Sequence, residues 1–348
     1  MTNNLLIENS NVETICILCW GLIGDVFMRI PVIELIKKHY PDALLTCVVD
    51  PVGEQVLQNH PDVTNVIVFS REKSNKYSYI KQTIVNIMIL RREKFDLSVN
   101  LYSGGSSPLI SRLIGAQIRL GFDHTYSLRK YNTISAPHPS FCQHWTVALA
   151  SILTPLGIAA GSVRRGSSFY TSKKADDYAT EKINGRKTII FNLGAGQIDK
   201  QWPVKSYVQL ARYINQNYGL IPLIITNPGS EELTNLFKNL AGSDFEFEIL
   251  SLMNLDCIGA ILKQSIALVT GDTSIMHLGF GVKCPTFVLF TYTRPEIVEP
   301  EDCMHIPCFI ENEDEFNACE NHPGTLYMDV DYVISKFSIL YDKLSNQR

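Results

Sequence analysis

The sequence predicts an α/β protein made of two doubly wound domains, each with a parallel sheet covered by helices on both faces. Three observations lead to this prediction. The chain has 348 residues, more than one hydrophobic core usually supports. Short apolar runs alternate with helical patterns in both halves, which is typical of parallel sheets. Between the halves, residues 157–174 are rich in Gly, Ser and basic residues and are predicted to form a linker.

The alternation can be followed along the chain. In the first half, apolar runs predict strands at 14–20, 44–50, 63–69, 96–102 and 117–123, and helical patterns run from the first strand to about 39, at about 79–92, at 108–115 and at about 144–156. In the second half, strands are predicted at 188–194, 220–226, 247–250, 265–271 and 285–290, and helices at 204–218, 231–240, 254–264 and 274–281. We expect domains at 1–165 and 175–328, and a final helix at 329–348 that packs back on the first domain. Two such domains would bind a ligand in the cleft between them, beyond the carboxyl ends of their strands.

The composition narrows the classes of function. With 45% apolar and 19% charged residues, the chain is an ordinary globular protein, and its formal charge of −4 offers no broad field for nucleic acid. No apolar segment reaches the roughly 20 residues that span a bilayer, and the first 14 residues lack the pattern of a secretion signal. We therefore expect a cytoplasmic protein that can touch a membrane surface, with its nine cysteines reduced.

The first strand runs into the stretch CWGLIGDV, where Gly24 and Asp25 lie in a loop before a helix. Such loops often bind phosphate at the helix N-terminus, but a carboxylate would repel a phosphate. The loop offers Gly21 and Gly24 without the third glycine of a dinucleotide fingerprint, which counts against a dinucleotide-dependent oxidoreductase. Asp25 is therefore a helix cap, an acid for another kind of ligand, or both. Pro31 predicts a kink or a later helix start.

The stretch VTGDTSIMHLGFG is the better candidate for an anion site. Here a strand ends, and Asp272, Thr273 and Ser274 supply oxygens that can cap the next helix. The N-terminus of that helix presents free N–H groups and the positive end of the helix dipole, which favour a diphosphate. His277 lies one turn further along the same face, and a packed core histidine is the favoured interpretation for it.

Two other strand ends supply candidates. In FNLGAGQIDKQWPV, a strand runs into a loop with Gly194, and Lys200 precedes the Trp-Pro pair that begins a helix. A lysine presents a compact positive charge suited to a phosphate leaving group. After the following strand, Glu231 and Glu232 begin a helix; the dipole favours acids there, and either could bind ribose hydroxyls.

Residues 303–322 raise the question of a metal site. They contain Cys303, His305, Cys308, Cys319 and His322, enough soft ligands for zinc or iron. Their spacing matches no usual zinc pattern, so we expect free thiols in a structured loop and predict no metal.

Four stretches together resemble glycosyltransferase family 9, the ADP-heptose heptosyltransferases of bacterial lipopolysaccharide synthesis. They are GLIGDVFMRIPVIELIKKHYPDA, NLYSGGSSPLISRLIGAQIRLGF, NLGAGQIDKQWPVKSYVQLA and GDTSIMHLGFGVKCPTFVLF, and the resemblance spans about residues 14–330. It implies a GT-B fold, two facing Rossmann-like domains with a cleft between them, in which the second domain holds most of the donor nucleotide. It also implies an inverting transfer that uses an ADP-sugar as substrate and requires no metal or other cofactor.

Residue by residue, the resemblance implies that Asp25 is the catalytic base of the first domain. Such a base takes the proton of an acceptor hydroxyl as its oxygen attacks the anomeric carbon, while a lysine and a helix N-terminus stabilise the departing diphosphate. The candidate donor-binding residues are Gly194, Lys200, Glu231, Asp272, Thr273, Ser274 and His277.

The sequence thus predicts a cytoplasmic glycosyltransferase that moves a heptose from ADP-heptose to a lipopolysaccharide or lipooligosaccharide core, compatible with peripheral contact with the inner membrane. The TYTRP stretch at 291–295 replaces the family's Gly-Pro-Thr-Asp-Pro and indicates a divergent member. The acceptor could therefore instead be a protein hydroxyl, or the donor another nucleotide sugar. A dinucleotide-dependent oxidoreductase and a non-catalytic nucleotide-sugar sensor are the alternatives from other classes. No nucleic-acid partner is predicted.

Overall fold

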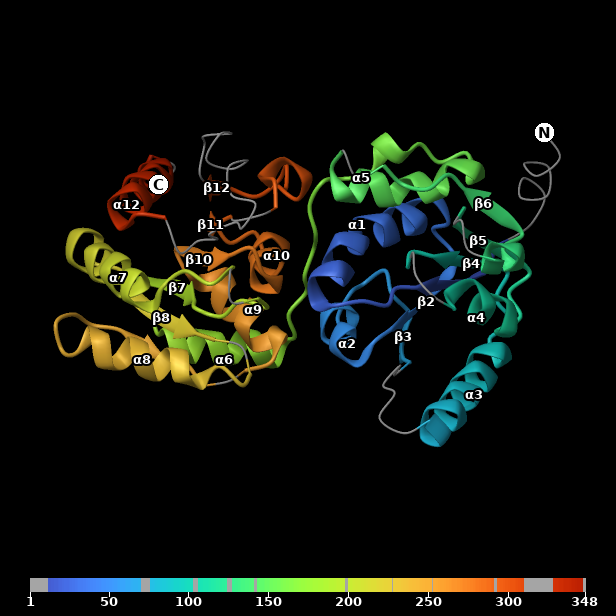
Figure 1. Ribbon diagram of the computed structural model, residues 1–348, viewed down its shortest axis with the longest axis horizontal. Helices are drawn as coiled ribbons and strands as arrows, with labels where there is room; N and C mark the ends of the chain where they lie inside the picture. The colour runs from blue at the N-terminus through green and yellow to red at the C-terminus, as the bar shows by residue number, and fades with distance from the viewer. Residues whose placement is uncertain are drawn as a thin grey trace. The chain divides into compact units, whose positions relative to one another are not determined.

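The computed structural model describes residues 12–69, 76–102, 106–123, 127–140, 143–197, 200–226, 228–251, 253–290, 293–309 and 328–346. The chain divides into two compact units (Figure 1). The first comprises Met1–Phe169 and Ile297–Glu301, and the second comprises Tyr170–Glu296 and Asp302–Arg348. The chain therefore returns briefly to the first unit after most of the second has been built, which a division into contiguous domains did not anticipate.

The first unit is a parallel sheet covered by helices on both faces (Figure 1). Its strands are β1 Thr14–Leu18, β2 Leu44–Val49, β3 Asn65–Val68, β4 Leu97–Asn100, β5 Ile118–Phe122 and β6 Ile134–Ala136. They are hydrogen-bonded in the order β3-β2-β1-β4-β5-β6. Helices α1 (Ile23–His39), α2 (Pro51–Leu57) and α5 (Trp145–Ala150) cover one face, and α3 (Lys76–Arg92) and α4 (Ser107–Leu113) cover the other.

The second unit repeats this construction. Its strands are β7 Thr188–Asn192, β8 Ile221–Ile225, β9 Glu248–Ile249, β10 Ala267–Gly271, β11 Thr286–Leu289 and β12 His305–Cys308, in the order β12-β11-β10-β7-β8-β9. Its helices are α6 Lys173–Ile183, α7 Val204–Tyr218, α8 Glu231–Ala241, α9 Leu255–Gln264, α10 Ser274–Gly281 and α12 Val330–Ser345. Helices α7, α8 and α12 lie on one face, and α6, α9 and α10 on the other. The predicted pair of doubly wound α/β units is confirmed.

In both sheets the strand order reverses between the first and the fourth strand of the unit, and we call this point the winding change. The first and fourth strands of each unit are neighbours, β1 beside β4 and β7 beside β10. Ligands of doubly wound sheets bind beyond the carboxyl ends of the strands at this point. The segments that follow β1, β7 and β10 carry Asp25, Lys200 and Asp272. Topology alone therefore puts the predicted site residues at the two ligand-binding edges.

Helix α1 runs through Pro31, so a helix that begins only at the proline is wrong. Proline lacks an N–H group, which leaves the carbonyl four residues earlier, that of Phe27, without its intrahelical donor. The Ser167 hydroxyl donates to Phe27 O at 2.6 Å. This bond satisfies the open carbonyl and fastens the segment before the second unit onto α1.

The final helix α12 packs on the second unit, so the expectation that residues 329–348 return to the first domain is wrong. Its apolar stripe of Val333, Phe337 and Leu340 is fully buried in the core of the second unit. The ring centroid of Phe337 lies 5.5 Å from that of Phe287 on β11. The apolar face of α12 is covered by its own sheet and by α7.

Among the described residues, four α-helices and strands escaped the sequence analysis: α2, α6, β6 and β12. Helix α6 begins where the linker was expected to end, and β12 lies in the expected cysteine loop. Both missed strands are at most four residues long and sit at sheet edges, too short for a periodic signal. Within the described residues, no helix has both the length and the apolar character that crossing a bilayer requires.

Candidate functional site

Carboxylates occupy the loop between β1 and α1. Gly21 has φ +141°, a conformation that side chains rarely adopt. Its N–H donates to Asp50 Oδ2 at 2.9 Å, and the next N–H, that of Leu22, donates to Asp25 Oδ2 at 2.9 Å. A phosphate at this helix N-terminus would need these same N–H groups. The loop thus binds two acids of its own chain, which argues against a dinucleotide here.

Asp25 is half-buried in the first turn of α1. Its Oδ2 accepts the Leu22 N–H, so the capping role considered from the sequence is present. In the part of the chain that the structure describes, its Oδ1 has no hydrogen-bond partner. One carboxylate oxygen therefore holds the side chain in place, and the other is available to a ligand.

Arg29 is a buried cation beside this loop that the sequence analysis missed. It is 7% exposed, and it donates from Nε to Leu101 O at 3.2 Å and from Nη1 to Trp20 O at 2.5 Å. These carbonyls follow β4 and β1, so the guanidinium joins the two strand ends at the winding change. A Cβ on Gly21 would lie 2.6 Å from Asp25 Oδ2 and 2.9 Å from Arg29 Nη1, so only glycine lets both groups approach. The spacing of four residues between Asp25 and Arg29 on one helix was the available signal.

In the second unit, Lys200 and Asp272 meet at the winding change. Lys200 Nζ lies 2.7 Å from Asp272 Oδ2, and the two side chains are 21% and 11% exposed. Thr293 Oγ1 donates to the same carboxylate oxygen, although it belongs to the stretch that departs from the family pattern. A Cβ on Gly271 would lie 3.3 Å from Lys200 O, so this glycine lets the lysine loop come close. The pair fixes the Lys200 ammonium next to the start of α10.

Thr273 is the N-cap residue of α10, but its hydroxyl makes no cap bond, so the expected capping by this side chain is wrong. Its Oγ1 instead lies 3.2 Å from Thr270 Oγ1 and 3.2 Å from Asn192 Nδ2. Asn192 is fully buried at the end of β7 and also donates to Gly194 O at 3.2 Å. Because the buried Asn192 amide requires hydrogen-bond partners, the Thr273 hydroxyl bonds to this amide and not to the N–H groups of α10. The N–H groups in the first turn of α10 therefore donate no bond to the Thr273 hydroxyl, which leaves room for an anion, although the Met276 N–H donates to the Thr273 carbonyl at 3.1 Å.

The other predicted donor residues lie around these two strand ends. Ser274, half-buried, is the first residue of α10. His277 is 9% exposed and packs edge-on against Phe280 in α10, which agrees with its interpretation as a core residue. Glu231 is exposed at the start of α8, where its Oε1 accepts the Gly229 N–H at 3.2 Å. The acid thus stabilises the turn after β8, at the same sheet edge as Lys200.

The candidate metal ligands do not come together as far as the structure describes them. Cys308 is fully buried in β12, and Cys303 Sγ donates to Cys284 O at 3.3 Å. Burial raises the pKa of the Cys303 thiol to about 12, which disfavours the thiolate that a metal needs. No group of three His, Cys, Asp or Glu side chains suited to a metal occurs among the described residues. Cys319 lies outside them.

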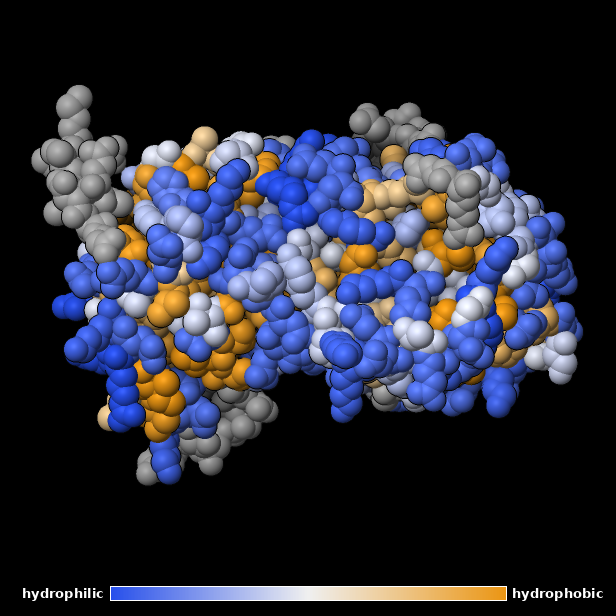
Figure 2. All heavy atoms as spheres, turned by 180° about the vertical axis from the view of Figure 1, so that it is seen from behind, coloured by the Kyte–Doolittle hydropathy of each residue, from blue (hydrophilic) through white to orange (hydrophobic). Residues whose placement is uncertain are grey.

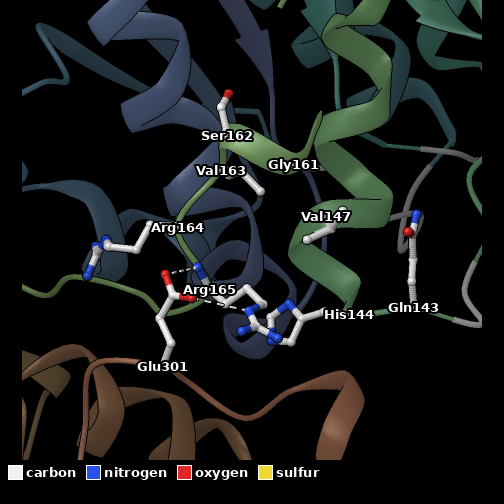
Figure 3. A pocket seen from close by; sticks show the side chains of 9 residues that line it. All are labelled: Gln143, His144, Val147, Gly161, Ser162, Val163, Arg164, Arg165 and Glu301. Atoms are coloured by element: carbon white, nitrogen blue, oxygen red, sulfur yellow. Dashed lines mark hydrogen bonds and ion pairs between the residues drawn. The ribbon is translucent and has the colours of Figure 1, made fainter. Parts of the chain in front are cut away.

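A pocket of about 610 Å³ in the first unit is lined by none of the predicted site residues (Figure 3). Glu301 accepts the Arg165 N–H and its Nε–H, each at 3.2 Å. His144 Nε2 donates to Glu299 O at 3.0 Å, and burial lowers the pKa of His144, which keeps the ring neutral. The pocket is therefore the junction where the returning segment 297–301 is held on the first unit.

Several known proteins are similar to this chain in sequence and fold. The chain matches the family described as glycosyltransferase family 9 (heptosyltransferase) over residues 87–314. It is 22% identical over 277 residues to lipopolysaccharide heptosyltransferase 3 of Escherichia coli, which covers 78% of this chain and 81% of that protein. The glycosyltransferase family 9 structure from Veillonella parvula superposes with a TM-score of 0.85 at 19% identity, covering 96% of this chain and 99% of that one. The E. coli ADP-heptose lipopolysaccharide heptosyltransferase II gives 0.79 at 17% identity, covering 95% and 99%. These likenesses confirm the expected GT-B fold.

Proposed function

The chain belongs to glycosyltransferase family 9, the heptosyltransferases, and on this premise we propose that it transfers a heptose from ADP-heptose to a hydroxyl of a lipopolysaccharide or lipooligosaccharide core, with inversion at the anomeric carbon. One observation carries the proposal: a carboxylate with an available oxygen lies at one ligand-binding sheet edge, and a lysine at an uncapped helix start lies at the other. Transfer from a sugar diphosphate needs both a base and a stabilised leaving group. The names of the relatives, lipopolysaccharide heptosyltransferase and ADP-heptose heptosyltransferase, support the choice of donor and acceptor.

On the donor side, Lys200 and the N-terminus of α10 bind the diphosphate. The ammonium gives one of its three hydrogens to Asp272 and keeps the others for phosphate oxygens. Asp272 would itself repel a diphosphate, so its role in this proposal is to position the lysine. Ser274 and the positive end of the α10 dipole complete the site. Because the lysine and the helix end offset the charge of the leaving ADP, the proposed step requires no metal or cofactor.

On the acceptor side, Asp25 is the base. Its Oδ2 stays on the Leu22 N–H, and its Oδ1 takes the proton of the acceptor hydroxyl. The hydroxyl oxygen forms the new bond to the anomeric carbon while the bond from that carbon to the ADP oxygen breaks on the opposite face, so the configuration inverts. Arg29 holds the ends of β1 and β4 in register around this loop.

The test is a transfer reaction with purified protein, ADP-heptose and a core acceptor that lacks the added heptose. We expect release of ADP, a gain of one heptose in the mass of the acceptor, and an inverted anomeric configuration by NMR. A heptose found on protein Ser or Thr instead of the core would overturn the proposed acceptor.

A thermal-shift series with ADP-heptose, UDP-sugars and NAD tests the donor, because a ligand that binds only the folded chain raises its melting temperature. ADP-heptose should give the largest shift. A shift with NAD alone would overturn the proposal as a whole.

A further inference from the structure

The outer face of α3 carries an unusual group of exposed aliphatic side chains. Ile80, Ile84, Val85, Met88 and Ile89 are between 42% and 55% exposed. Their spacing of three, four and five residues places them along one side of the helix, and we call them the α3 patch. Figure 2 shows apolar surface gathered at the place of α3, at the lower left, beside strongly polar side chains. Contiguous apolar surface of this kind marks an interaction site.

The opposite face of α3 is already used for folding. Leu90 is fully buried in the core cluster of the first unit that also contains Trp20 and Phe69, and Ile87 packs against this cluster. The α3 patch therefore does not serve the internal core. Trp20 precedes the Gly21 loop, so the same cluster supports both α3 and the loop that holds Asp25.

The charged side chains of α3 itself are all basic, and one acidic residue, Glu93, is exposed directly after the helix. The 17 residues of α3 include four basic residues and no acidic residue, although the whole chain has a formal charge of −4. Lys81, Arg91 and Arg92 are exposed. Lys81 lies four residues before Val85, and Arg92 lies four residues after Met88. Both cations therefore flank the α3 patch.

We propose that the α3 patch docks the first unit on an anionic lipid bilayer. Aliphatic side chains flanked by lysine and arginine are the combination that enters the boundary between headgroups and acyl chains, where anionic lipids attract the cations. A second copy of this chain fits the patch less well, because a symmetric pair would place its cations against the same cations of the other copy. The lipid surface is therefore the occupant that matches both the apolar and the charged side chains.

The inference rests on the proposed function for its biological use, because the acceptor of that reaction is a glycolipid. Docking through α3 would bring the unit that carries Asp25 to the surface where the acceptor hydroxyl is presented. Vesicle binding itself is measured without donor or turnover, so a chain that binds vesicles but transfers no heptose would refute only the proposed function.

The experiment is co-sedimentation of the full chain with vesicles of phosphatidylethanolamine and phosphatidylglycerol, compared with vesicles of phosphatidylcholine alone. We expect binding to the anionic vesicles that weakens as salt is raised, and much weaker binding to the neutral ones. The double variant Ile84→Asp/Met88→Asp should bind at least about tenfold more weakly, since it removes apolar area and adds two negative charges. Lys81→Ala/Arg92→Ala should lose roughly fivefold in affinity for each charge removed.

A matched control lies on α8 of the second unit, where Leu236 and Leu240 are 46% and 42% exposed at the same spacing of four residues. Leu236→Asp/Leu240→Asp should bind vesicles like the unmodified chain. Equal binding by the α3 and α8 variants, or no binding by the unmodified chain, would overturn the proposal. So would a lipid-free dimer that Ile84→Asp/Met88→Asp converts to a monomer without any binding of vesicles by either form, since the occupant would then be a second copy.

Discussion

Replacing Asp25 by asparagine separates the two roles of this side chain. The amide oxygen of asparagine can still accept the Leu22 N–H that Oδ2 accepts at 2.9 Å, so the first turn of α1 keeps its bond. The oxygen that takes the acceptor proton is replaced by an NH₂ group, which cannot do so. A general base contributes about 10²–10⁴-fold in rate, so kcat should fall by that factor, roughly 3–5 kcal/mol in the barrier. The free energy of unfolding should change by less than about 1 kcal/mol, because the bond to Leu22 is retained.

Three measurements on Asp25→Asn decide this prediction: kcat from ADP release, the Kd of ADP by calorimetry, and the melting temperature. The Kd should stay within about twofold, because the proposed diphosphate site is on the other sheet. The companion variant Asp25→Ala also loses the hydrogen bond to the Leu22 N–H, which lowers the free energy of unfolding by about 1 kcal/mol. For a unit of this size, that loss lowers the melting temperature by about 2–4 °C. If Asp25→Asn keeps more than a tenth of kcat, the proposed base is wrong. If it loses ADP binding, the proposed division between the two sheets is wrong.

Other substitutions test the donor site, the second core and an ion pair. Lys200→Met should weaken ADP binding by about 10–150-fold in calorimetry, because it removes a charged hydrogen bond to phosphate. Phe337→Ala should lower the free energy of unfolding by about 3–5 kcal/mol in denaturant titrations, since this ring is fully buried against the sheet of the second unit. Burial raises the pKa of Glu34, but contacts with His60 and with Arg164, 2.9 Å away, outweigh it and leave the pKa below its usual 4.5. Glu34 therefore stabilises the fold at pH values above about 4.5 and loses this effect as the pH falls below it, so the difference in melting temperature between the unmodified chain and Glu34→Gln should shrink towards pH 3.

Each of these has its own control. For Lys200, the variant Asp272→Asn should weaken ADP binding less, because it loosens the lysine without removing it; an unchanged Kd in Lys200→Met would remove the lysine from the site. For Phe337, the exposed Ile339 on the same helix should tolerate alanine with a change below about 1 kcal/mol. Equal effects at both positions would contradict the packing of α12. A Glu34→Gln difference that stays constant with pH would show that the carboxylate charge is not what stabilises the fold.

The fold was predictable because its signal is local. Buried parallel strands are continuous apolar runs, and helices between them show a period near 3.6, so the alternation in residues 14–123 and 188–290 is enough to indicate two doubly wound units. The same reasoning failed for α2, α6, β6 and β12, where the segments are polar or very short. It also failed for α12, because an apolar stripe shows that a helix is buried but not against which sheet.

The candidate site was predictable only in part. Glycine loops after apolar strands pointed to Asp25, Lys200 and Asp272, since strand ends in such sheets meet ligands. The bond between Lys200 and Asp272 joins residues 72 apart, and it depends on β7 and β10 being neighbours in the sheet. Arg29 gave only the weak signal of its spacing from Asp25, and Asn192 gave none, because their partners are backbone carbonyls after β1 and β4 and a hydroxyl on β10.

Local chemistry in the sequence thus determined the kind of protein: an α/β chain with an acid at one strand end and anion-binding candidates at others. Only the tertiary structure decided how each group is used. One Asp25 oxygen accepts the Leu22 N–H and the other has no partner among the described residues, and Asp272, a candidate donor-binding residue, accepts a hydrogen bond from Lys200. The physical reason is that a side chain's role depends on which groups strand order brings within about 3 Å, and strand order is a property of the whole sheet.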